Sequence, residues 1–242
     1  MNKALVLGAS GATGSLLVKR LLQHGVKVIA IVRSRSSIEN SFIGESGLQI
    51  VEAGISKITE DELVQYLQEC DVVFSCLGHN LTFKGLFGQP RRLVTDAIKK
   101  AAKVINLIGA ENKTKVILMN TTGNSNRDIP ETPPLSQRII VALLRLVLPP
   151  HADNEDAADF LRLEIGQSDQ FIEWVVVRPD TLINEQDISR YDIVASPLRN
   201  VIFNAGKTSR INVADFMCEL AINAELWNAW KGKMPVIYNH EE

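Results

Sequence analysis

The chain reads Gly8-Ala9-Ser10-Gly11-Ala12-Thr13-Gly14 directly after the apolar run Lys3–Leu7. Such a run is typical of a β-strand that is buried on both faces. After the glycines, leucine and valine recur at helical spacing until Gly25, which predicts a helix that ends there. A strand, a glycine-rich turn and a helix in this order predict the start of an α/β fold.

Each glycine of this motif has a physical task. One permits the tight turn, one lets the backbone approach a pyrophosphate, and one allows the helix to pack closely against the strand. The N-terminus of the helix presents unpaired N–H groups and the positive end of its dipole. We therefore expect Gly8, Gly11 and Gly14 to form a phosphate-binding turn, with an ordinary structural turn as the alternative.

The rest of the first half repeats the alternation of strand and helix. A capping box, Thr59 with Glu62, opens one helix, and Pro90 precedes another. Further strands are predicted at Val26–Val32, Leu48–Glu52, Asp71–Leu77 and Val116–Asn120. This order predicts an α/β, Rossmann-type doubly wound parallel sheet with helices on both faces.

The second half is less regular. We expect a polar loop at Thr121–Pro134 and an apolar helix at Ser136–Leu148. A second helix, acidic in its first turn, is expected at Asp153–Gln167. A strand at Trp174–Val177, a helix at Val213–Ala224 and a strand at Pro235–Tyr238 are expected after it. The apolar helix could cover a substrate pocket, contact a second subunit or lie in the core. Residues 1–242 are expected to form one domain, with a cofactor-binding core at 1–123 and a small substrate-side region within 124–242.

Composition excludes several classes of protein. With 26 basic and 28 acidic residues the net charge is −2, so a nucleic-acid partner is not expected. The three cysteines and four histidines form no metal-binding spacing, and the cysteines are expected to be reduced and buried. The longest apolar stretch, Ile139–Leu148, is about half of a membrane span and contains Arg145. No signal peptide is evident, and we expect a cytoplasmic protein without membrane contact.

Arg33 indicates which dinucleotide binds. Sites for NAD usually carry Asp or Glu about 20 residues after the glycines, bonded to the ribose 2′-hydroxyl. Here the corresponding segment reads Arg33-Ser34-Arg35. A guanidinium pairs with a 2′-phosphate through charge-assisted hydrogen bonds, whereas a carboxylate would repel it. The pattern favours NADP(H), with an ordinary solvated arginine as the alternative.

Several motifs together resemble the atypical short-chain dehydrogenase/reductase superfamily. The most similar branch binds NAD(P)H and includes NmrA-like regulators and flavin- or biliverdin-reductase-like proteins. The motifs are the glycine turn, Arg33, Ser75-Cys76-Leu77-Gly78, Asn120-Thr121-Thr122-Gly123 and Val177-Arg178-Pro179. The resemblance covers most of the chain and is strongest over residues 3–123.

The resemblance implies a role for each matching position. It assigns Ser10, Ala12 and Thr13 to the pyrophosphate, Arg33 to the 2′-phosphate, Leu77 and Gly78 to the adenine-side ribose, Thr121 and Thr122 to the surroundings of the nicotinamide, and Arg178 and Pro179 to a cover over it. Family members often have Gly-Asp after the third strand, where the Asp touches adenine. This chain has Gly54-Ile55, which leaves only a backbone contact there.

The usual proton donor of short-chain dehydrogenases is missing. That donor is a tyrosine followed four residues later by a lysine, so that both lie on one helix face. The three tyrosines, Tyr66, Tyr191 and Tyr238, are followed at this spacing by Cys70, Ala195 and Glu242. No Tyr-x-x-x-Lys pair exists in the chain.

Three other residues are candidates for catalysis. His151 lies one helical turn before Glu155, although a helix-entry residue with an acidic first turn is the simpler interpretation. Thr122 carries a hydroxyl that could orient a substrate carbonyl, or it could simply be a β-former. His79, with Asn80, follows the fourth strand at the edge where α/β sheets bind ligands, or belongs to an ordinary loop.

These features favour an NADPH-dependent reductase whose partner is a small-molecule acceptor, such as a quinone, a flavin or an enone. The alternative is a non-catalytic NADP(H) sensor of the NmrA-like kind that reports to a regulatory protein partner. A nucleotide-sugar epimerase or dehydratase is a third hypothesis, and its relatives normally keep the tyrosine. A homodimer is also possible on this sequence.

Overall fold

The computed structural model describes residues 1–38, 41–79, 89–131, 149–200 and 203–240, together with Ser136, Ile140 and Leu143. The apolar helix expected at Ser136–Leu148 lies, apart from those three residues, outside the described part of the chain. The same holds for Asn80 and for the end of the polar loop after Glu131.

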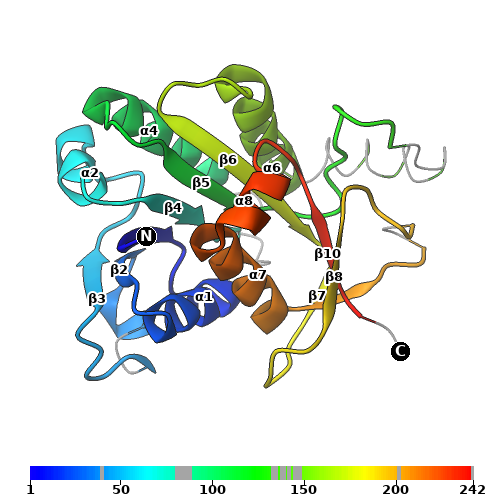
Figure 1. Cartoon of the computed structure of the whole chain (residues 1–242), viewed down its shortest axis with the longest axis horizontal. Helices are drawn as coiled ribbons and strands as arrows, with labels where there is room; N and C mark the ends of the chain where they lie inside the picture. The colour runs from blue at the N-terminus through cyan, green and yellow to red at the C-terminus, as the bar shows by residue number, and fades with distance from the viewer. Residues whose placement is uncertain are drawn as a thin grey trace.

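One mostly parallel sheet forms the centre of the molecule (Figure 1). Its strand order is β3-β2-β1-β4-β5-β6-β10-β8, in which β8 alone runs antiparallel to its neighbour. The bounds are β1 Lys3–Leu7, β2 Lys27–Val32, β3 Leu48–Glu52, β4 Val72–Ser75, β5 Thr114–Met119, β6 Ile172–Pro179, β8 Tyr191–Val194 and β10 Val236–Asn239. The order 3-2-1-4-5-6 is that of a doubly wound dinucleotide-binding sheet, so the predicted Rossmann-type fold is confirmed.

Helices cover both faces of this sheet. One face carries α1 (Ala12–Gln23), α7 (Arg210–Ile222) and α8 (Ala224–Trp230), and Figure 1 shows α1 and α7 side by side. The other carries α2 (Glu60–Leu67), α4 (Leu93–Ile108) and α6 (Pro149–Asp159). Alternate residues of β1 serve the two layers, because Ala4 and Val6 pack towards α1 while Leu5 and Leu7 pack towards α4.

Two elements differ from the sequence-based expectation. The helix expected from Asp153 begins at Pro149, so the predicted acidic first turn is wrong, and its continuation at Phe160–Ile165 is a π-helix. Two further strands, β7 (Thr181–Ile183) and β9 (Lys207–Ser209), pair in parallel as a small second sheet. Figure 1 shows β7 beside β8 and β10, at the carboxyl ends of the later strands.

No helix in the described residues is both long enough and apolar enough to span a membrane.

Candidate dinucleotide site

The turn between β1 and α1 can be built only with glycine at two positions. Gly8 has φ of +77°, and a Cβ there would lie 2.6 Å from the carbonyl oxygen of Cys76 at the end of β4. A Cβ on Gly14 would overlap the carbonyl group of Gly8. These two glycines therefore let the turn pass against β4 and let α1 begin close to β1.

The N-terminus of α1 has the features of an anion-binding site. Its N-cap is Gly11, which has no side chain to occupy the first amides of the helix, and its first turn holds no acidic residue. Free N–H groups and the positive end of the helix dipole therefore face outwards beside Ser10. A phosphate satisfies both features at once.

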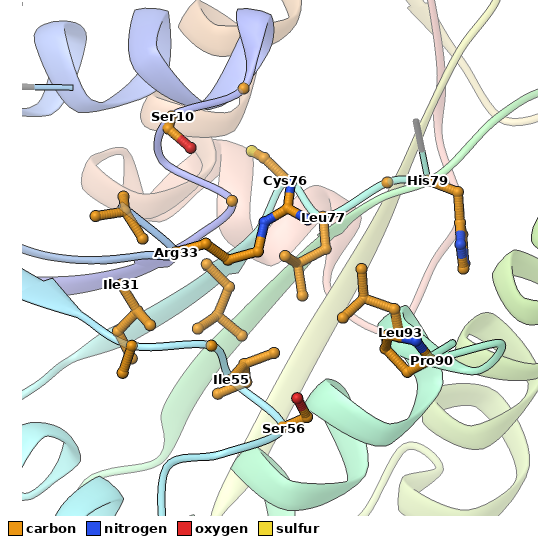
Figure 2. A pocket seen from close by; sticks show the side chains of 17 residues that line it. Ser10, Ile31, Arg33, Ile55, Ser56, Cys76, Leu77, His79, Pro90 and Leu93 are labelled. Atoms are coloured by element: carbon orange, nitrogen blue, oxygen red, sulfur yellow. The ribbon is translucent and has the colours of Figure 1, made fainter. Parts of the chain in front are cut away.

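A cavity of about 360 Å³ opens at this point, on the carboxyl edge of the sheet (Figure 2). It brings together the glycine turn, the ends of β2 and β3, the end of β4 and the start of α4. Of the predicted site residues, Gly8, Ser10, Gly11, Arg33, Leu77, Gly78 and His79 line it. Its volume lies in the range of small-molecule and cofactor pockets.

The cavity has one polar and one apolar wall. The glycine turn and Arg33 contribute the polar groups, whereas Ile31, Ile55, Leu77 and Leu93 contribute aliphatic surface. Figure 2 shows Arg33 reaching inwards from the end of β2, with Ile55 and Leu93 on the other side. An anionic pyrophosphate beside the turn and a flat base against the aliphatic wall fit this division.

Sequence reasoning missed much of the apolar wall. Ile31, Cys76, Pro90 and Leu93 also line the cavity, as does Ile55, for which only a backbone contact was expected. These residues lie at or just after strand ends, or at the start of α4. Their place at the carboxyl edge of the sheet was the available signal.

Arg33 is the charged side chain that faces this cavity. The neighbouring Arg35 is turned away, because its Nη2 donates to the carbonyl oxygen of Ile50, 2.9 Å away on β3. Among the described residues that line the cavity, none is acidic. The local field therefore favours an anion, and no carboxylate is present among them to bond a ribose 2′-hydroxyl.

A histidine and a buried carboxylate meet at one end of the cavity. His79 Nε2 lies 2.8 Å from Asp153 Oδ2, and the same carboxylate accepts the backbone N–H groups of Val94 at 2.8 Å and Thr95 at 2.9 Å. Asp153 thus caps the N-terminus of α4 from the second turn of α6. His79 is held on this cap while it lines the cavity.

A family model described as NAD(P)H-binding matches residues 8–224. The chain belongs to this family. A search of curated proteins finds no match.

Similar folds occur among solved structures. A wide-type short-chain dehydrogenase/reductase from Veillonella parvula in complex with NADP is 15% identical, with a TM-score of 0.70 over 98% of this chain and 94% of that one. A candidate NADH-flavin reductase from Streptococcus pneumoniae is 18% identical, with a TM-score of 0.64 over 99% and 100%. An anaerobillin reductase from Escherichia coli is 15% identical, with a TM-score of 0.65 over 100% and 98%.

In this NAD(P)H-binding protein, Thr122 is buried and hydrogen-bonded within the protein. The residue is 4% exposed, and its N–H donates to the carbonyl oxygen of Pro179 at 3.1 Å. Its hydroxyl donates to the buried carboxylate of Asp180, which also accepts N–H groups from Thr181 and Gly206. Burial raises the pKa of Asp180, and these hydrogen bonds oppose the rise. The substrate-orienting role of the Thr122 hydroxyl stays a prediction, and its neighbour Thr121 is only partly buried.

The side chain of Arg178 is also engaged elsewhere. It is fully buried and donates to the carbonyl oxygens of Met234, Asn124 and Ala195 and to a carboxylate oxygen of Glu131, at 2.7–3.1 Å. The expected cover over the nicotinamide by Arg178 and Pro179 stays a prediction. For the pair Arg178-Pro179, only main-chain atoms and the proline ring remain for such a contact.

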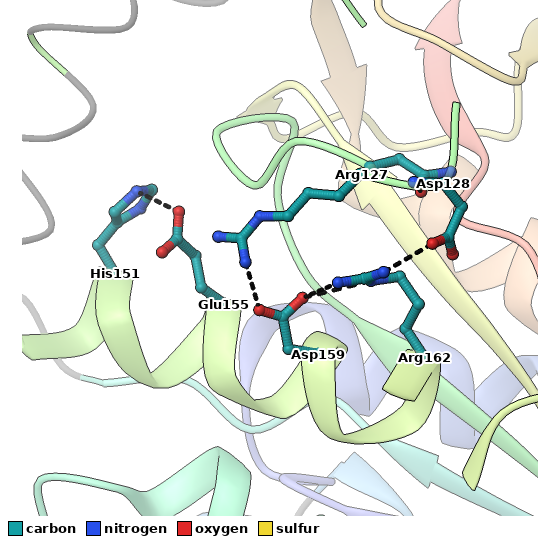
Figure 3. A network of polar contacts seen from close by, with 7 residues as sticks. Arg127, Asp128, His151, Glu155, Asp159 and Arg162 are labelled. Atoms are coloured by element: carbon teal, nitrogen blue, oxygen red, sulfur yellow. Dashed lines mark hydrogen bonds and ion pairs between the residues drawn. The ribbon is translucent and has the colours of Figure 1, made fainter. Parts of the chain in front are cut away.

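His151 lies beside the loop that follows β5. Its Nε2 is 3.6 Å from Glu155 Oε1, and its Cε1 lies 3.4 Å from where a Cβ on Gly123 would stand. Figure 3 shows this pair on the same helix as an ionic network. In that network Asp159 binds Arg127 and Arg162, and Arg162 binds Asp128, at 2.6–3.1 Å. The network fastens the loop after β5 to α6 and its π-helical continuation.

The tyrosines and Cys76 offer no alternative acid or nucleophile. Burial and the nearby Asp215 raise the pKa of Tyr191, whose hydroxyl donates to that carboxylate at 2.9 Å. No tyrosine is among the described residues that line the cavity. Burial raises the pKa of Cys76 to about 12, so its thiol stays protonated and serves packing, as predicted.

Ala12, Thr13, Gly14, Thr121 and Pro179 are not among the described residues that line the cavity. Ala12, Thr13 and Gly14 form the first turn of α1, directly after the cavity-lining Gly11. Their assignment to the pyrophosphate, and that of Thr121 to the nicotinamide, stay predictions.

Proposed function

We propose that the chain is an NADPH-dependent reductase that transfers a hydride to a small acceptor of the quinone, flavin or enone type. The observation that carries the cofactor preference is Arg33, which faces a cavity without a described acidic lining residue. The 2′-phosphate of NADP(H) would pair with this guanidinium, whereas NAD(H) has only a hydroxyl at that position.

The chain's own residues would bind and orient the reactants. The first turn of α1 would hold the pyrophosphate, and the aliphatic wall with Ile55 and Leu93 would hold the adenine half. The bound dinucleotide supplies the hydride chemistry. Quinones and flavins suit a site without the Tyr-x-x-x-Lys pair, because their reduction can take its protons from water.

The cofactor preference is tested by replacing Arg33 with alanine. One charge-assisted hydrogen bond contributes about 1.5–3 kcal/mol, so its loss should make NADPH bind about 10- to 150-fold more weakly. NADH affinity should change by less than about twofold. Arg35→Ala is the matched control, because that guanidinium is bound to β3. Isothermal titration calorimetry measures the affinities of the unmodified protein and both variants for NADPH and NADH, and equal losses of NADPH and NADH affinity in Arg33→Ala would overturn the assignment.

A second candidate is a non-catalytic NADP(H) sensor that acts through a protein partner. It is favoured by the buried Thr122 hydroxyl and by the absence of tyrosine among the described cavity residues. The two functions differ in turnover. A reductase oxidises NADPH when quinones, flavins or enones are added, whereas a sensor binds NADPH tightly and turns over none of them. An epimerase or dehydratase has less support, because its relatives use the tyrosine.

A further inference from the structure

A second hollow continues the dinucleotide cavity, between the loop after β3 and one face of α4. Its volume is about 180 Å³, and it shares Ile55, Ser56, Pro90 and Leu93 with the cavity. We propose that the adenine base of the dinucleotide lies among these shared residues and that Asp96, which lines the second hollow, accepts a hydrogen bond from the amino group of the base. This inference rests on the NADP(H) binding of the proposed function, and it names the residue that selects adenine over purines that lack the amino group.

The shared residues come from two sides of the cavity. Ile55 and Ser56 belong to the loop between β3 and α2, whereas Pro90 and Leu93 lie at the start of α4. Figure 2 shows Ser56 between Ile55 and the start of α4, with its hydroxyl directed towards the cavity. Ile55 and Leu93 offer aliphatic surface to a flat base. An edge of the base then faces the second hollow, which the same residues border.

One face of α4 supplies the charged groups of the second hollow. Leu93, Asp96, Ala97 and Lys100 line it, and their spacing of three and four residues places them on the same side of the helix. Leu93 also lines the cavity, so Asp96 lies less than one helical turn beyond the aliphatic wall. Among the described residues that line either space, Asp96 alone is acidic. A charged acceptor is therefore available at this end, away from Arg33.

Lys100 fixes the distance between the two walls. Its Nζ donates to the carbonyl oxygens of Ile55 at 3.1 Å and of Ile58 at 2.7 Å, and it thereby ties the loop after β3 to α4. Lys103 of α4 also pairs with Glu60 of α2 at 2.6 Å. The slot between the loop and the helix is therefore formed before a base enters, which lowers the entropic cost of binding.

The cationic neighbours of Asp96 in the sequence have other partners. Arg92 pairs with Asp156 at 3.2 Å, and Lys99 pairs with Glu164 at 3.0 Å. Asp96 itself is exposed, and within the described residues its carboxylate makes no hydrogen bond or ion pair. Both of its carboxylate oxygens can therefore accept from a ligand.

The hydrogen-bonding groups fit adenine and disfavour its oxo analogue. Adenine carries an amino donor beside a ring-nitrogen acceptor on its edge. The Asp96 carboxylate only accepts and the Ser56 hydroxyl can donate, so together they match this pair. Hypoxanthine has a carbonyl oxygen in place of the amino group, and two acceptors would then face each other without a proton between them. Asp96 therefore selects adenine, while Arg33, at the end of β2, receives the 2′-phosphate.

The first experiment compares NADPH with reduced nicotinamide hypoxanthine dinucleotide phosphate, in which an oxygen replaces the amino group of the base. Isothermal titration calorimetry should show that the unmodified protein binds the hypoxanthine dinucleotide about 10-fold more weakly, because one hydrogen bond to a charged group is lost. Asp96→Ala should weaken NADPH binding by about 10-fold and change the affinity of the hypoxanthine dinucleotide by less than about threefold, so the preference disappears. Asp96→Asn offers an amide N–H to the carbonyl oxygen and should raise the affinity of the hypoxanthine dinucleotide.

Three controls locate the effect. Asp61→Asn is the matched variant, because Asp61 is also an exposed helical aspartate but is not among the described residues that line either space, so the preference should stay unchanged. Arg33→Ala should weaken both dinucleotides by the same factor, because both carry the 2′-phosphate. Adenosine 2′,5′-bisphosphate, which lacks the nicotinamide half, should lose as much affinity in Asp96→Ala as NADPH does. Circular dichroism melts verify that each variant is folded.

Each outcome has a distinct meaning. If the unmodified protein binds neither dinucleotide, the proposed function is overturned and this inference with it. If NADPH binds but the two dinucleotides bind equally, or if the preference survives in Asp96→Ala, only the inference is overturned. An equal change of preference in Asp61→Asn would assign the effect to net charge and would also overturn it. Turnover of no acceptor, with the preference present and lost in Asp96→Ala, would overturn the reductase and support this inference.

Discussion

Replacing Arg178 with methionine should destabilise the folded protein strongly and leave the dinucleotide site unchanged. Arg178 lies in β6 with no exposed surface, and its guanidinium holds four acceptors. Two of them, Asn124 and Glu131, belong to the loop after β5, and the other two flank β10 and β8. Methionine keeps most of the apolar stem and removes every one of these bonds.

The size of the stability loss depends on Glu131, the charged partner that remains after the substitution. The Glu131 side chain is 5% exposed and pairs with Arg178 at 2.7 Å, so the substitution leaves a buried carboxylate without its cation. Removing one member of a buried ion pair costs about 3–5 kcal/mol. For a chain of this length that loss lowers Tm by roughly 6–20 °C.

Urea unfolding followed by circular dichroism measures the loss, and calorimetry measures NADPH affinity below the transition. Affinity should stay within about twofold, because the guanidinium does not line the cavity. Arg127→Met is the matched control. Arg127 is 46% exposed and pairs with Asp159 at 2.7 Å, and an exposed pair contributes less than about 1 kcal/mol.

Two results would refute this reasoning. A loss of stability below about 1 kcal/mol in Arg178→Met would mean that the four bonds do not hold the loop after β5 to β8 and β10. Unchanged stability with tenfold weaker NADPH binding would mean that the guanidinium contacts the dinucleotide, as the family resemblance implied.

Three further predictions concern single positions. Gly8→Ala should destabilise the protein more than Gly25→Ala. Both positions have positive φ, which costs about 1–2 kcal/mol for alanine, but of the two only a Cβ at Gly8 meets a backbone carbonyl. Thermal melts that show equal losses would contradict this close approach. Cys76 should resist alkylation by N-ethylmaleimide at pH 8 while the protein is folded, because burial raises its pKa to about 12; rapid modification seen by mass spectrometry would contradict its packing role. Hydrogen bonds from the backbone N–H and hydroxyl of Thr59 lower the pKa of Glu62 from 4.5. The contribution of Glu62 to stability is therefore present above pH 4.5 and is lost as the pH falls through the lowered pKa. Glu62→Gln should flatten the acid limb of a plot of urea midpoint against pH, and an unchanged limb would exclude this contribution.

Most strands of the first half were predictable because they are buried on both faces of the sheet. Lys3–Leu7 was predicted with the bounds that the structure has, since a continuous apolar run ended by glycine leaves little freedom. The edge strand Leu48–Glu52, which is only partly buried, was also predicted with its bounds. The short strands β7, β8 and β9 were not predicted. Tyr191–Val194 is only partly buried, and its place in the sheet depends on pairing with Val236–Asn239, more than 40 residues away.

The candidate dinucleotide site also has features that were predicted from the sequence and features that were not. The glycine turn and Arg33 were predicted because their task depends on local backbone geometry and on distance along the chain from the first strand. The pair of His79 and Asp153 was not, because 74 residues separate them and only the packing of α6 against α4 brings them together. Pro149 extends the helix backwards, and Asp153 thereby caps a neighbouring helix instead of its own.

Local sequence alone thus determined the fold class, the glycine turn and the charge beside it, since each depends on spacing, backbone freedom and residue type. Tertiary structure decided which polar groups face the cavity. Thr122 and Arg178 match the family motifs, yet both are buried and bonded within the protein. Burial is set by what packs on a residue from distant parts of the chain, and no local pattern encodes it.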